Sequence, residues 1–141
     1  MPNLDIFTER QQATLRALID RIIPPDDFPG GWDAGVGDYL ARQFERDLRT
    51  MVDMYRAGLD ALEAEAYAAQ GAGFAVLEPT EQDALLRHVE AGDVATVWTT
   101  DPVAFFRAAC VHANEGFYSD PGNGGNRDAV AWPMIGFEVR G

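Results

Sequence analysis

The fold is decided by residues 36–70, VGDYLARQFERDLRTMVDMYRAGLDALEAEAYAAQ, because apolar residues recur through them in steps of three or four. Such steps place side chains on one face of a helix. A continuous helix of this length would span roughly 50 Å, at about 1.5 Å per residue, which is long for a small domain. We therefore expect a bend or break near Arg49–Asp53 or at Gly58, and a left-handed cap at Gly71. The seam consists of Val36, Leu40, Phe44, Leu48, Met51, Tyr55, Leu59, Leu62 and Ala66.

The residues before this segment predict a second helix and a loop. Thr8 and Gln11 form a capping-box pattern, and an apolar stripe follows them up to Pro24-Pro25. A proline disfavours helical geometry in the residue before it, so the helix should end there. Residues 24–35 are predicted to be an ordered loop anchored by Phe28 and Trp32.

Two further helices are predicted in the second half of the chain. One should begin at Thr80 and end at Gly92, and another should begin at Asp101-Pro102, whereas the period of residues 93–100 is ambiguous. The period places Glu63 and Glu65 on solvated faces. The buried face of the last helix should consist of Phe105, Phe106, Ala109, Ala113 and Phe117.

The tail, residues 119–141, has no helical period, yet it is too apolar for a disordered end. We expect it to be ordered and irregular, and rich in glycine and aromatic residues. The whole chain, residues 1–141, is thus predicted to be a single all-α domain, a small bundle of about four to six helices followed by this tail.

The charge balance excludes several functions. The chain has 11 basic residues, all of them Arg, and 23 acidic residues, which gives a net charge of −12. Nucleic-acid binding and docking on anionic lipid both need a basic face, and Schiff-base chemistry needs Lys. No stretch approaches the roughly 20 apolar residues that span a bilayer. Residues 1–10 show no signal core or twin-Arg pair, so the expected location is cytoplasmic, or periplasmic if a leader has been removed.

Few residues suggest catalysis. His112 and Glu115 form half of a carboxylate-bridged metal site without a second pair, and a surface or satisfied core histidine is the favoured interpretation. Cys110 is expected to be a buried hydrophobe. The glycines after Asp120 could form an anion nest, but a tight turn is favoured, and Arg127 could pair with a carboxylate. A stand-alone small enzyme or ligand-binding domain that uses this loop is the alternative function.

Several segments resemble the gluconate 2-dehydrogenase subunit 3 family. The tail carries its C-terminal signature in EGFYSDP (residues 115–121), GGNRD (residues 124–128), Trp132 and IGF (residues 135–137). Residues 18–24, 55–62 and 74–86 resemble earlier family segments. The chain departs from the family in lacking the export signal, in Asn123 where an aromatic residue is usual, and in Ala131 where Gly is common.

The resemblance implies a non-catalytic accessory subunit. Its partner would be the catalytic subunit of a sugar or polyol dehydrogenase, a flavoprotein similar to glucose-methanol-choline oxidoreductases that holds the FAD, whereas this chain would bind no cofactor. A scaffold that joins the dehydrogenase to a cytochrome c subunit is a further alternative. The tail would supply the interface, with aromatic anchors and one charged partner. The predicted partner-binding residues are Tyr118, Asp120, Pro121, Gly124, Gly125, Asn126, Arg127, Trp132 and Phe137.

Overall fold

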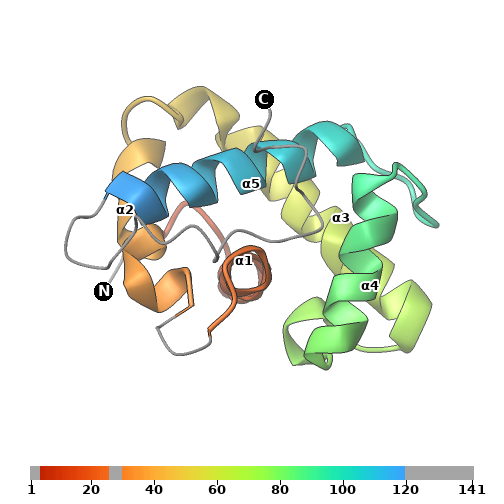
Figure 1. Cartoon of the computed structure of the whole chain (residues 1–141). Helices are drawn as coiled ribbons and strands as arrows, with labels where there is room; N and C mark the ends of the chain where they lie inside the picture. The colour runs from red at the N-terminus through yellow and green to blue at the C-terminus, as the bar shows by residue number, and fades with distance from the viewer. Residues whose placement is uncertain (1–3, 26–29, 120–141) are drawn as a thin grey trace.

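The computed structural model describes residues 4–25 and 30–119 of the chain (Figure 1). These residues form five α-helices and three short helical turns, and no strand, which confirms the all-α prediction. The helices are α1 (Glu9–Ile22), α2 (Gly37–Phe44), α3 (Val52–Gln70), α4 (Pro79–Glu90) and α5 (Pro102–Ser119). The turns are η1 (Trp32–Val36), in which Gly35 leaves helical geometry, and the 3₁₀ turns η2 (Arg49–Met51) and η3 (Phe74–Val76).

Helix α1 lies at the centre of the bundle. Figure 1 shows it end-on, with α5 crossing above it, α2 on one side and α4 on the other. It packs on α3, α4 and α5, so its apolar stripe is enclosed. The capping box is present, since Gln11 N donates to Thr8 Oγ1 and Thr8 N donates to Gln11 Oε1, both at 3.0 Å. The fully buried residues of this stripe are Leu15, Leu18, Ile19 and Ile22.

The long seam is interrupted between α2 and α3, as the sequence predicts. Helix α2 ends at Phe44, and the chain turns through η2 before α3 begins at Val52. Gly58 is not the break but a point of close approach inside α3, where a Cβ atom would overlap the ring of Phe105. At the end of α3, Gly71 adopts the expected left-handed conformation, with φ of 73°.

Two predicted boundaries are wrong. Helix α4 begins at Pro79 with Glu78 as its N-cap, rather than at Thr80, because proline suits the first helical position and Glu78 N donates to Glu81 Oε1. The predicted loop at residues 24–35 gives way to η1 at Trp32, where Gly35 turns the chain with φ of 113°. Phe28 lies outside the described residues. Residues 93–100 form no helix.

The assignment of Glu63 and Glu65 to solvated faces is also wrong. Glu65 is only 4% exposed, and Glu63 is half-buried, with its Oε1 accepting from Phe74 N at 2.9 Å. The reason is that other helices cover two adjacent stripes of the α3 surface. Helix α1 packs on α3, and so do α4 and α5. Gly58, Ala61 and Glu65 fall on the second stripe, which the single seam at residues 36–70 does not include.

The carboxylate of Glu65 holds the loop between α4 and α5. It accepts hydrogen bonds from Ala95 N at 3.0 Å, Thr96 N at 2.7 Å and Trp98 Nε1 at 3.1 Å, and another from the Thr96 hydroxyl. Burial alone would raise the pKa of Glu65, but these four donors together lower it. The loop is therefore fixed by an ionised side chain and not by a secondary-structure ladder.

Replacing Gly58 tests the approach of α3 to α5. Inside a helix, Ala normally stabilises the folded state by about 1 kcal/mol relative to Gly. We expect Gly58→Ala instead to lower the free energy of unfolding by about 1–3 kcal/mol, because the Cβ forces the Phe105 ring to move. Urea denaturation measures the change, and Ala64→Gly, at an exposed position of the same helix, reports the propensity effect alone. A more stable Gly58→Ala protein would contradict the packing.

Glu65 should make the free energy of unfolding depend on pH in the acid range. Its pKa is lower in the folded state than the unfolded value of about 4.3, so its contribution is complete above that value. The contribution is lost as the pH falls through the folded pKa. We expect Glu65→Gln to lower the free energy of unfolding by about 1–3 kcal/mol at neutral pH, because the amide NH₂ cannot accept from the partly buried donors that it faces. The acid limb of the stability curve should become flatter. Glu45→Gln, at an exposed carboxylate, should change neither the stability at neutral pH nor the shape of the stability curve. The same slope in the Glu65→Gln protein would refute this role.

Candidate partner-binding surface

Only one of the predicted partner-binding residues lies in the described part of the chain. Tyr118 occupies the last turn of α5 and is 43% exposed. The remaining residues lie outside the described residues, and so do the segment expected to form a tight turn or an anion nest and the possible carboxylate partner position of Arg127. They are Asp120, Pro121, Gly124, Gly125, Asn126, Arg127, Trp132 and Phe137.

The outer face of α5 forms a stripe around Tyr118. The inner face is as predicted, with Phe105, Phe106, Ala109, Ala113 and Phe117 each no more than 1% exposed. Val111, 42% exposed, lies about two helical turns before Tyr118, and the exposed Glu115 lies between them. We call Val111, Glu115 and Tyr118 the α5 stripe. Val111 was not predicted as part of the surface, although its spacing of seven residues from Tyr118 indicates a shared face.

A close contact with α2 holds the end of α5 in place. A Cβ atom at Gly116 would lie 2.8 Å from Cδ2 of Tyr39, so the helix backbone rests directly on that ring. Burial, the charge of Glu115 and a hydrogen bond to it raise the pKa of the Tyr39 hydroxyl. The Tyr118 ring meets Phe117 edge-on, with ring centroids 5.5 Å apart. The α5 stripe is therefore carried by a helix end that is packed on its inner side.

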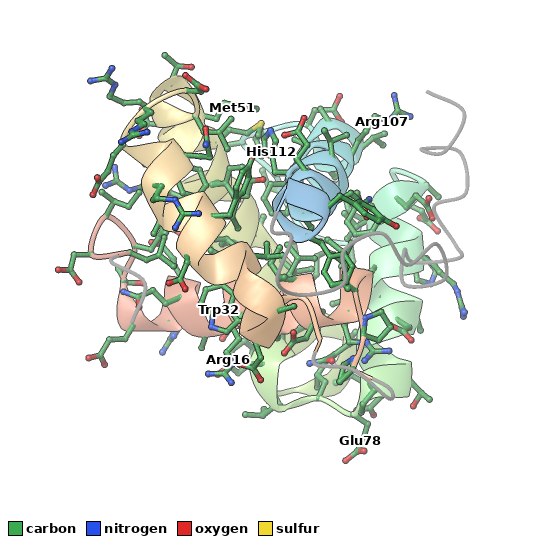
Figure 2. The ribbon with its side chains drawn as sticks, turned by 60° about the vertical axis from the view of Figure 1, so that its left-hand side comes forward. Arg16, Trp32, Met51, Glu78, Arg107 and His112 are labelled. Atoms are coloured by element: carbon green, nitrogen blue, oxygen red, sulfur yellow. The ribbon has the colours of Figure 1, made fainter. Side chains whose placement is uncertain are left out.

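His112 is a satisfied core histidine, as the sequence indicates. Its Nδ1 shares a hydrogen bond of 2.6 Å with the Tyr55 hydroxyl, and the residue is only 8% exposed. Burial lowers the pKa of His112 despite the opposing effect of Glu115. Figure 2 shows its side chain at α5 among the surrounding sticks. The neutral imidazole thus completes the packing of α5 on α3.

Cys110 and His88, the other described Cys and His side chains, lie on different helices, α5 and α4. Cys110 is completely buried, as expected. His88, on α4, lies 3.2 Å from the carboxylate of Asp93 at an exposed position. In residues 4–25 and 30–119, no group of three His, Cys, Asp or Glu side chains could hold a metal ion. None of the helices formed by these residues has the length and apolar character needed to cross a membrane.

Comparison with known protein families gives a match over nearly the whole chain. The family model of gluconate 2-dehydrogenase subunit 3 matches residues 9–139. The chain belongs to this family. The match includes all five helices and the segments that carry the C-terminal signature. No curated protein and no solved structure matches the chain. Membership of the subunit 3 family indicates a subunit of a dehydrogenase complex.

The bond between Tyr55 and His112 should be needed for stability. Tyr55→Phe leaves the buried imidazole without its partner, so we expect a loss of about 1–3 kcal/mol in the free energy of unfolding. Tyr67→Phe, at an exposed position of α3, should change it by less than about 0.5 kcal/mol. Urea denaturation at pH 7.5 compares the two proteins. Equal stabilities would show that the hydrogen bond contributes nothing.

Proposed function

We propose that the chain is a non-catalytic accessory subunit that binds and stabilises the FAD-containing catalytic subunit of a sugar, polyol or glycoside dehydrogenase. The match to subunit 3 over residues 9–139 carries this proposal. The catalytic subunit is of the glucose-methanol-choline type and holds the flavin, while this chain holds no cofactor. A partner that binds only the native state stabilises it by mass action, by about 2.7 kcal/mol at a hundredfold excess over Kd.

The arrangement of the helices supports a docking role for the end of α5. The described residues enclose a core of their own, contributed by all five helices. The α5 stripe lies outside that core, and the signature residues follow α5 directly in the chain. Tyr118 therefore connects the packed bundle to the segment in which Arg127, Trp132 and Phe137 are proposed as anchors. Large aromatic residues and arginine are the side chains that most often dominate interface energetics.

Co-expression tests the proposal. The catalytic subunit of the same complex is produced with the full chain, with a chain that ends at Ser119, or with a Tyr118→Ala chain. We expect soluble yield and flavin-dependent activity to fall strongly with the shortened chain and severalfold with Tyr118→Ala. Tyr67→Ala, at a residue that is 51% exposed on α3, is the matched control and should behave as the full chain does.

Circular dichroism of each accessory chain alone separates a binding defect from a folding defect. Full yield and activity of the catalytic subunit with no accessory chain would refute the proposal. Dehydrogenase activity of this chain without the flavoprotein would favour the stand-alone enzyme. Retention of a cytochrome c subunit by this chain, with no binding to the flavoprotein, would favour the scaffold.

A further inference from the structure

A cavity lies where α1, η1 and the start of α2 meet. Its volume is about 540 Å³, and its lining is both apolar and charged. Figure 2 shows two of the lining side chains, Trp32 and Arg16, together at the lower end of the bundle. The lining residues are Leu4, Gln12, Ala13, Arg16, Trp32, Asp33 and Asp38. None of them belongs to the signature at the C-terminus.

Two contacts position Trp32, one through its backbone and one through its ring. The Trp32 backbone N–H donates to Asp20 Oδ1 at 3.0 Å. Its ring rests on the backbone of Gly37, where a Cβ atom would lie 2.9 Å from the indole carbon Cε2. The ring remains only partly buried, because the cavity adjoins it. The cavity thus has an aromatic wall in a fixed position, which reduces the entropy lost when a group packs against it.

The charges around this wall are predominantly negative. Asp33 and Asp38 line the cavity together with a single cation, Arg16. The Arg16 guanidinium is 3.6 Å from Asp33 Oδ1, and both side chains are more than half exposed. An exposed pair of this kind contributes little stability, so an incoming cation can replace Arg16 at low cost. Asp38 is also exposed.

The best complement to an aromatic face flanked by carboxylates is a guanidinium group. It is planar and stacks on indole, and it donates paired hydrogen bonds to a carboxylate. An ammonium group also interacts with an aromatic face, but it is not planar and cannot form the paired bonds. The net charge of −12 also attracts a basic partner surface. In addition, η1 packs on α5, so the cavity and the α5 stripe are carried by contacting elements.

We infer that this cavity is a second docking site, which receives an arginine side chain of the catalytic subunit against Trp32, with Asp33 and Asp38 as its carboxylate partners. The inference rests on the proposed function, because the arginine comes from that subunit. The end of α5 and the cavity then contact the partner at two separate points, and the affinity of the complex exceeds that of either contact alone.

Binding measurements with the purified catalytic subunit test this inference. Asp38→Arg reverses a charge at an exposed position and should weaken binding at least about tenfold, with a smaller loss at high salt. Trp32→Ala should weaken it at least about tenfold at any salt concentration. Asp93→Arg, at an exposed aspartate in the loop after α4 that does not line the cavity, is the matched control and should bind as the unaltered chain does.

Free arginine provides an independent probe. At equal ionic strength, arginine should compete with the complex more strongly than lysine, and the difference should vanish in the Trp32→Ala chain. If the chain with its own sequence binds tightly and Asp38→Arg and Trp32→Ala bind equally well, the inference is overturned. The proposed function then remains intact. If Trp32→Ala weakens binding and Asp38→Arg does not, the group that packs on Trp32 is apolar and is not an arginine, which would also overturn the inference. No binding by the unaltered chain would refute the proposed function itself.

Discussion

The close approach of α5 to α3 at Gly58 is the contact on which the rest of the bundle depends. With no Cβ at this position, the Phe105 ring settles on the backbone of α3. Phe105 then meets Tyr55 edge-on at 5.7 Å and Trp98 at 6.0 Å between ring centroids. Tyr55 in turn reaches His112, further along α5. One missing side chain thus brings two helices close enough to share an aromatic core.

The same approach determines which surface remains for a partner. Because α5 turns its phenylalanines inward onto α1 and α3, the α5 stripe faces outward. Glu65 acts on the same helix pair, since it fixes the loop that leads into α5. The chain that follows α5 therefore starts from a helix that is packed along its length and fixed at its beginning. A segment that starts from a rigid element loses less entropy when it docks.

Much of this fold could be predicted from the sequence, because local signals carry it. The Thr8 cap, the left-handed Gly71 and the break before α3 each follow from a few neighbouring residues. The role of Glu65 could not be predicted, because it depends on a loop that arrives from 30 residues further along the chain. The turn η1 contains Gly35 at φ of 113° and packs against α5, a contact between distant segments that no local pattern encodes.

The functional surface could be predicted only in part from the sequence. The signature that begins at Glu115 predicts the family, and the match over residues 9–139 confirms it. Spacing alone identifies Val111 as a neighbour of Tyr118. The cavity at Trp32 had no sequence signal, because Leu4, Gln12, Trp32 and Asp38 come from different elements and meet only after folding.

Hydrogen exchange measured by mass spectrometry tests the central claim, which is that the catalytic subunit docks on the end of α5 and the signature that follows it. Exchange is compared between the chain alone and the chain bound to the catalytic subunit. We expect the largest slowing in peptides from residues 111–141, with a second protected region around Trp32. Slowing confined to α3 and α4, with unchanged exchange after Val111, would contradict the account.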